Sequence, residues 1–189
     1  MVNVVNLFEK LANELKPVTD EREANAAVAL LLEPVGEEDF SILLVKRAVQ
    51  QGDPWSGQMA LPGGKREPYD ASLKSTVERE ILEETGIGLT GSSFLGVLSP
   101  VHSVPQRGLL VLPFVILLDN KPTIKLERSE LVSYLWVSYE KILKSQGRAT
   151  IPLVGEVSAY LVADVPVWGL TYRILSEFSK IVEASKKPT

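Results

Sequence analysis

The chain has 189 residues, of which 45% are hydrophobic and 23% are charged, a composition typical of one globular domain with a substantial core. Its net charge of −4 gives no reason to expect general affinity for nucleic acid. It has no cysteine and a single histidine, which excludes disulfides and zinc–thiolate sites and argues against a histidine-based metal site or triad. Carboxylates must therefore carry most of any acid–base or metal chemistry.

The amino-terminal residues contain Glu9 and Glu14 and lack the basic segment of a secretory signal. The longest apolar run, residues 109–118, is far shorter than the ~20 residues needed to cross a bilayer. We therefore expect a cytoplasmic protein that does not bind membranes. A first amphipathic helix is predicted over residues 5–16, since apolar side chains recur at helical spacing up to Pro17.

Two short aliphatic runs, residues 26–32 and 41–45, flank an acidic turn and predict a hairpin buried on both faces. A polar loop follows, and then residues 60–64, Ala-Leu-Pro-Gly-Gly, predict a strand that ends in a tight loop. Glycines let the backbone of such a loop approach a ligand closely.

The central helix is predicted over residues 71–85, with Leu73, Val77 and Ile81 on its apolar side. Gly86 is placed to end it, and Asp70 is either its N-cap or an acceptor for Arg79. Arg79 is predicted to hold nearby carboxylates in place, because its guanidinium is a planar fork of donors.

The remaining elements complete an α/β pattern. They are strands over residues 94–99 and 109–118, an extended piece over 123–128, a helix-like start at 129 that turns into a strand near 134–137, a short helix over 139–144, a loop or irregular hairpin over 146–157, a strand over 160–162, a long helix over 168–184 and disorder over 186–189. This order predicts an α/β/α sandwich around a mixed β-sheet, built as one domain over residues 1–189.

The central helix carries an unusual load of acid. Glu80, Glu83 and Glu84 lie at i, i+3 and i+4 and point to one side, although each like-charge pair costs about 0.2–0.5 kcal/mol. Oxygen ligands of this kind suit Mg²⁺ or Mn²⁺. The alternative is a solvated acidic face, but the Gly-Gly loop that leads into the helix favours the metal site.

Residues 79–87, Arg-Glu-Ile-Leu-Glu-Glu-Thr-Gly-Ile, together with Gly64, resemble the Nudix box, G-x5-E-x7-R-E-U-x-E-E-x-G-U, where U is aliphatic. The box here spans residues 64–87. Asp70 stands where the box has glutamate, and one extra residue separates it from Arg79. Both features are usual in the coenzyme A diphosphatase branch of the family, which this chain also resembles at residues 43–48, 57–64, 112–115, 127–137 and 168–171.

The resemblance implies a hydrolase that cleaves a diphosphate linkage with Mg²⁺ or Mn²⁺. It implies that Glu80, Glu83, Glu84 and the Gly63 carbonyl bind metal, and that these glutamates and Arg79 form the catalytic set. Glu80, Glu83, Glu127 and Glu130 all remain open as the general base.

Arg47, Lys65 and Gly64 are predicted to bind substrate, and Lys46, Arg66 and Arg107 are expected nearby. Trp55 or Trp168 could stack on an adenine, although helix packing is favoured for Trp168, and His102 could border the pocket, although a lone histidine is more often an ordinary surface or packed residue.

Coenzyme A or a related adenine nucleotide is the expected substrate. An ADP-ribose or nucleotide-sugar pyrophosphatase is the alternative, because residues 49–55 lack the second arginine of the coenzyme A branch. A non-catalytic Nudix-fold binding module is a third possibility, though such modules usually lose box glutamates. A homodimer is compatible with the sequence.

Overall fold

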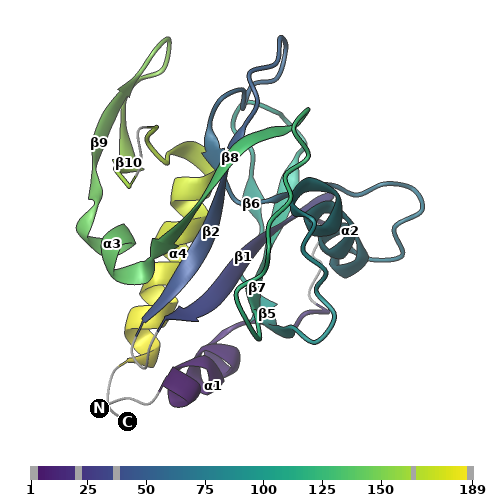
Figure 1. The fold of residues 1–189 in the computed structure, drawn as a ribbon. Helices are drawn as coiled ribbons and strands as arrows, with labels where there is room; N and C mark the ends of the chain where they lie inside the picture. Colours follow the sequence, from purple (N-terminus) through teal and green to yellow (C-terminus); the bar gives the residue numbers. More distant parts are fainter. Residues whose placement is uncertain (1–3, 20–22, 36–38, 163–164, 187–189) are drawn as a thin grey trace.

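The computed structural model describes residues 4–19, 23–35, 39–162 and 165–186 (Figure 1). The helices are α1 (Val4–Glu14), α2 (Leu73–Thr85), α3 (Tyr139–Lys144) and α4 (Gly169–Ser185). The strands are β1 (Ala26–Val35), β2 (Asp39–Arg47), β3 (Met59–Ala60), β4 (Gly63–Lys65), β5 (Ser93–Val97), β6 (Val101–His102), β7 (Leu110–Leu117), β8 (Leu131–Ser138), β9 (Gln146–Ile151) and β10 (Gly155–Tyr160).

Strand β1 lies at the centre of the main sheet. It pairs antiparallel with β2, as the hairpin prediction required, and parallel with β7, from Ala26 opposite Val111 to Leu32 opposite Leu117. Strands β3 and β8 extend the sheet beyond β2, β5 and β6 pair with β7, and β4 pairs with β1. One parallel pair among antiparallel ones makes this sheet mixed, as predicted.

Helices cover both faces of the sheet (Figure 1). On one face α2 packs Leu73, Val77 and Ile81 against alternate residues of β1, β2 and β7. On the other face α1 and α4 pack against the intervening residues of the same strands. Because both faces are covered, β1 and β2 are almost continuously apolar. The predicted α/β/α sandwich is confirmed.

The ends of α2 differ in part from the prediction. The N-cap is Ser72 rather than Asp70, and it forms a capping box in which the Ser75 amide donates to the Ser72 hydroxyl at 3.1 Å. Gly86 ends the helix in the left-handed conformation, as predicted. The extended piece then runs back along α2, and the backbone N–H groups of Lys125 and Glu127 donate to its last carbonyls.

Most other elements were also predicted. The tight Gly-Gly loop was wrong, because Gly63 and Gly64 lie in strand β4, which pairs with β1. The helix-like start at 129 was wrong, because β8 begins directly at Leu131 and pairs with β2. The irregular segment after α3 is the β9–β10 hairpin, which ends at Tyr160 rather than continuing as a strand to 162. Residues 187–189 lie outside the described residues, as does most of the turn before β2. No helix in the described part of the chain is long and apolar enough to cross a membrane.

Candidate active site

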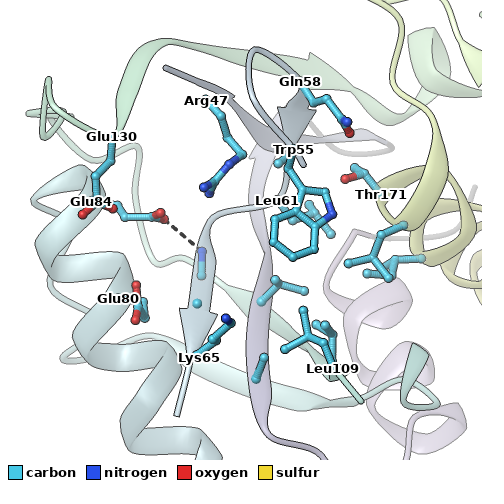
Figure 2. Close-up of a pocket in the computed structure, with 18 residues that line it drawn as sticks. Arg47, Trp55, Gln58, Leu61, Lys65, Glu80, Glu84, Leu109, Glu130 and Thr171 are labelled. Carbon is cyan, nitrogen blue, oxygen red and sulfur yellow. Dashed lines mark hydrogen bonds between the residues drawn. The ribbon is translucent and has the colours of Figure 1, made fainter. Parts of the chain in front are cut away.

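A cavity of about 390 Å³ opens between α2, the Gly-Gly strand β4 and the start of α4 (Figure 2). Its lining combines residues far apart in the sequence. They are Ala26, Val28, Arg47, Trp55, Gln58, Ala60, Leu61, Gly63, Gly64, Lys65, Glu80, Glu84, Leu109, Val111, Glu130, Leu170, Thr171 and Ile174. Predicted residues from the loop, the helix and β2 therefore meet in one place.

Both positions at the start of β4 require glycine, because neighbouring atoms leave no room for a Cβ at either one. Gly63 has φ +138° and pairs with Val28, and a Cβ there would lie 2.2 Å from the Ala27 carbonyl oxygen. A Cβ on Gly64 would lie 2.4 Å from the carboxyl carbon of Glu80. The first glycine thus lets β4 pair with β1, and the second makes room for an acidic side chain of the predicted site.

Glu84 is anchored by the same strand. The Gly63 N–H donates to its Oε2 at 2.9 Å, which Figure 2 shows as a dashed line. Glu84 is only 3% exposed, and this burial raises its pKa to about 8. The negative charges of Glu80 and Glu130 act in the same direction, while the Gly63 hydrogen bond and Arg47 oppose them. Burial likewise raises the pKa of Glu80.

Arg79 organises the acidic face of α2 from outside the cavity lining. Its guanidinium donates to Glu80 Oε1 at 2.8 Å, to Glu83 Oε2 at 3.0 Å and to the Lys65 carbonyl at 3.2 Å. It also donates to both carboxylate oxygens of Asp70, at 2.9 and 3.1 Å. The structure thus decides between the two roles open to Asp70: it is the acceptor for Arg79 and not the N-cap.

Asp70 is buried, and the Arg79 guanidinium holds the pKa of its carboxyl well below the usual range. Thr76 and the Glu67 amide donate to it as well, each at 2.9 Å. Burial opposes this shift, but the bonds to the ionised form outweigh it.

Asp70→Asn is expected to lower the free energy of unfolding by about 3 kcal/mol at pH 7, because the partly buried charge of Arg79 stays and loses its main partner. The lowered pKa means that Asp70 stabilises the fold above the unfolded carboxyl pKa of about 3.9 and that this contribution is lost as pH falls further. Urea unfolding at pH 7 and pH 3 measures both effects. Glu78→Gln, which removes an exposed charge next to Lys74, is the control, and equal losses in the two variants would contradict the role of Asp70.

Glu83 lies apart from the other two glutamates of the predicted set. Its side chain is 59% exposed, bonds to Arg79 and does not line the cavity. Among the described residues, no three carboxylate or histidine side chains form a ready-made metal centre. Glu80, Glu84 and Gly63 are the predicted metal-binding residues that line the cavity, and the metal-binding role of each, like that of Glu83, stays a prediction.

Arg47 lies at the end of β2 and faces Glu84 across the cavity (Figure 2). Its Nε and Nη2 donate to Asp53 Oδ2 at 3.2 and 2.9 Å. The other oxygen of Asp53 accepts the Trp55 backbone N–H at 3.0 Å. One carboxylate therefore holds both the predicted phosphate-binding arginine and the loop that carries the tryptophan.

Some of the remaining candidate residues line the cavity and others do not. Lys65 and Glu130 line it, but Lys46, Arg66, Arg107, His102, Trp168 and Glu127 do not. Arg66 instead donates to the carbonyls of Asp70 and Ala71, and the His102 carbonyl accepts from Arg173. Of the five cations predicted to lie near the substrate, Arg47 and Lys65 line the cavity, and a place near it for the other three stays a prediction.

Sequence reasoning missed Asp53 as a partner of Arg47, and Gln58 and Thr171 as lining residues. Thr171 belongs to the segment at 168–171 that resembles the coenzyme A branch, which was the available signal for it. Asp53 and Gln58 carried none, because loop residues reveal their partners only when the loop is folded.

The comparisons agree with this geometry. The sequence model of the NUDIX domain matches residues 22–154. Nudix hydrolase 22, chloroplastic, of Arabidopsis thaliana is 32% identical over 174 residues, which are 85% of this chain and 56% of that protein. The uncharacterized Nudix hydrolase NudL of Photorhabdus laumondii is 27% identical over 188 residues, 97% of this chain and 100% of that protein.

An uncharacterized protein of Schizosaccharomyces pombe is 30% identical over 170 residues, 79% of this chain. The chain spans about half the length of this relative and of the Arabidopsis protein, 51% and 56%. Among solved structures, the MutT protein from Methanosarcina mazei Go1 aligns with a TM-score of 0.56 and 27% identity over 91% of this chain and 98% of that one. The chain therefore belongs to the Nudix hydrolase family, whose enzymes are pyrophosphohydrolases.

Proposed function

We propose that the protein hydrolyses the diphosphate linkage of coenzyme A or a related adenine nucleotide. One observation carries the proposal: two glutamates of the box, the buried Glu84 and the partly buried Glu80, line the same cavity as Arg47, beside the Gly-Gly strand. Phosphoryl transfer needs charge compensation and positioning rather than a covalent nucleophile, and these groups supply both. The binding-module alternative is disfavoured because both cavity glutamates are present.

Nudix enzymes generally need a divalent metal, and the cavity fits one. Burial makes ionisation of Glu80 and Glu84 unfavourable, and a cation would offset that cost. These two carboxylates and the Gly63 carbonyl would hold Mg²⁺ or Mn²⁺, with Glu83 as the further ligand that the box implies. A bound cation would neutralise the charge that develops on the phosphate oxygens.

The chain's own groups have separable tasks. Arg79 fixes the Glu80 carboxylate, and the Gly63 N–H fixes that of Glu84. Arg47 supplies positive charge to the substrate phosphates from the opposite wall. Glu130 and Glu80 are the general-base candidates that line the cavity, whereas Glu127 and Glu83 do not.

ADP-ribose or a nucleotide sugar is the second candidate substrate. The specific observation in its favour is the small number of cations at the cavity, since Arg47 and Lys65 alone of the five expected line it. The 3′-phosphate of coenzyme A adds negative charge that further cations would have to balance. Dephospho-coenzyme A, which lacks this phosphate, separates the two requirements.

The test is a comparison of kcat/KM for coenzyme A, dephospho-coenzyme A and ADP-ribose at one Mg²⁺ concentration. We expect a coenzyme A form to be hydrolysed best, yielding 4′-phosphopantetheine and an adenosine phosphate. If ADP-ribose is hydrolysed at least tenfold more efficiently than either coenzyme A form, the second candidate replaces the first.

Arg47→Ala is expected to lower kcat/KM by more than tenfold, about 1.4 kcal/mol of transition-state binding. Asp53→Asn should lower kcat/KM by less than Arg47→Ala does. It keeps the shape of the side chain and removes only the charge that holds Arg47 in place. The double variant should resemble Arg47→Ala, since both changes act through one guanidinium. Arg148→Ala is the matched control, as Arg148 pairs with Glu156 at 2.9 Å in the distant hairpin. Additive losses, or an unchanged kcat/KM in Arg47→Ala, would contradict the assignment.

A further inference from the structure

Strand β8 forms an edge of the main sheet. Among the described strands it pairs with β2 alone, so the backbone groups on its other side have no strand partner there. Figure 1 shows β8 in front of β2, as the last strand on its side of the sheet. Proteins usually protect such an edge with charged side chains, proline or a bulge, because an open edge pairs with further strands.

The hydrogen bonds of β2 show which backbone groups of β8 face outward. The Arg47 N–H donates to the Gln58 carbonyl, on the β3 side of β2. Because successive residues of a strand direct their backbone groups to opposite edges, the alternate residues of β2 bond toward β8. These are Ile42, Leu44 and Lys46, and their partners in register are Val137, Leu135 and Ser133. The N–H and C=O groups of Tyr134 and Trp136 therefore face the open edge.

One end of this edge is protected and the rest is open. The register between β2 and β8 shifts next to Val132, which marks a bulge, and the Arg128 side chain donates to the Val132 carbonyl at 2.8 Å. A bond from a side chain outside the β2–β8 pair agrees with a carbonyl that faces outward. Residues 133–138, by contrast, include no charged residue and no proline.

The side chains beside the open edge are apolar and partly exposed. Val132 and Tyr134 are 43% and 45% exposed, and the Trp136 side chain is half-buried on the α2 face of the sheet. Aromatic and β-branched side chains that lie opposite each other on neighbouring strands stabilise the pairing of those strands. This edge is therefore well suited to pair with another uncharged strand of the same kind.

We propose that two copies of this chain associate through their β8 edges and form one continuous sheet across a two-fold axis at Leu135. Antiparallel pairing in this register places Tyr134 of each copy opposite Trp136 of the other. These residues exchange N–H···O=C bonds through groups that face outward in the single chain. The inference is independent of the proposed function, because neither aromatic side chain lines the cavity.

Charges at the two ends of the edge favour a second copy over an unrelated strand. The antiparallel register places Val132, with Arg128 on its carbonyl, opposite Ser138 of the other copy. Ser138 is the N-cap of α3, whose first turn carries the exposed Glu140. Each copy would therefore bring its Arg128 toward the Glu140 of the other, twice in one dimer. Complementary charges of this kind fix the register and orientation of an interface.

The mass of the full chain in solution tests the association, by light scattering on a size-exclusion column over a range of concentrations. The wild type should reach about twice the 20.8 kDa of a single chain. Tyr134→Pro removes one outward N–H and no bond to β2, and Tyr134→Lys adds a charge to the edge. Each change should raise the dissociation constant of the dimer at least tenfold, and circular dichroism checks that both variants are folded.

Leu153→Lys is the matched control for these changes. It removes a fully exposed leucine from the turn between β9 and β10, so it tests whether any exposed apolar side chain would have the same effect. We expect the mass of this variant to equal that of the wild type at every concentration.

Amide hydrogen exchange locates the contact residue by residue. The N–H groups of Tyr134 and Trp136 are open in a single chain and bonded in the dimer, whereas those of Leu135 and Val137 bond toward β2 in both states. Dilution of the wild type should therefore speed exchange at the first two amides at least tenfold and leave exchange at the other two unchanged.

Reversing the charges tests the register. Arg128→Glu and Glu140→Arg should each weaken the dimer severalfold. The double variant should recover most of the loss, because the two charges then meet again with their signs reversed. Additive weakening in the double variant would overturn this register.

A single-chain mass at every concentration would overturn the inference. A dimer that both Tyr134 variants leave intact, or one that Leu153→Lys dissociates, would contradict it as well, because the contact would then lie elsewhere. Protection of the Tyr134 and Trp136 amides that does not change on dilution would also contradict it, since another segment of the same chain would then cover the edge.

Discussion

Glu84→Gln is expected to reduce Mg²⁺-dependent hydrolysis by about 100-fold or more while the protein stays folded. Glutamine has the same shape and its amide oxygen can still accept the Gly63 N–H, but it offers no negative charge to a cation. Because burial, and next to it the charges of Glu80 and Glu130, raise the pKa of Glu84 to about 8, keeping this carboxyl buried near neutral pH costs stability, and glutamine removes that cost. The metal-free variant should therefore resist urea at least as well as the wild type.

Glu78→Gln is the matched control for this change. Glu78 is on the same helix and next to Lys74, but it does not line the cavity, so its loss should leave kcat unchanged. The hydrolysis rates of the wild type and of all the variants are measured over a range of Mg²⁺ concentrations. Full activity in both Glu80→Gln and Glu84→Gln would show that the cavity glutamates are not the metal site.

Alanine at the two adjacent glycines of β4 should affect different properties: the free energy of unfolding at Gly63 and the catalytic activity at Gly64. In Gly63→Ala the new Cβ would lie 2.2 Å from the Ala27 carbonyl oxygen and 2.6 Å from the Val28 Cα, both backbone atoms of the central strand. Neither can move without breaking the β1–β4 pairing, and φ +138° is strained for alanine. We expect a loss of about 3–5 kcal/mol in the free energy of unfolding.

In Gly64→Ala the nearest atoms belong to the Glu80 carboxylate, at 2.4 and 2.5 Å. This side-chain end can swing away, so the free energy of unfolding should change by less than about 1 kcal/mol. The displaced carboxylate would no longer occupy its place in the cavity, and kcat should fall at least tenfold.

Urea unfolding and kinetics on the same preparations separate the two glycine variants. Gly88→Ala is the control, since nothing lies within 4 Å of its added Cβ, and it should change neither quantity. If Gly64→Ala keeps its activity while Glu80→Gln loses it, the Glu80 carboxylate must act from a position other than the one it has in this structure. A fully stable Gly63→Ala would contradict the close strand pairing.

Local sequence features predicted most of the fold. The apolar periodicity placed α2, α4 and the β1–β2 hairpin, and Gly86 marked the end of α2 because a left-handed residue there favours glycine. The N-cap was misplaced because Asp70 and Ser72 are both good capping residues and the sequence does not show that Arg79 claims the first. Tertiary contacts decided between them.

The candidate site was predicted where its residues lie close together in the sequence. Glu80, Glu84 and Gly64 lie within the stretch that resembles the Nudix box, and Gly63 directly precedes it, so the resemblance placed them together. Asp53, Thr171 and Glu130 join the site from separate segments, and the sheet topology that assembles them is set by long-range pairing of β1 with β7 and of β2 with β8. Spacing carries no record of such pairings, which is why the roles of Asp53 and Thr171 emerged only from the structure and why Glu130 could not be separated from the other general-base candidates.

The most direct test of a metal-dependent diphosphate hydrolase at this cavity is product analysis in ¹⁸O-labelled water. Coenzyme A and ADP-ribose are incubated separately with the wild type and Mg²⁺, and the products are identified by mass spectrometry. The account predicts two phosphate monoesters from one of these substrates, one of them carrying a single ¹⁸O, and no products when EDTA replaces Mg²⁺. Absence of cleavage of both substrates with Mg²⁺, or release of inorganic phosphate with the diphosphate intact, would contradict it.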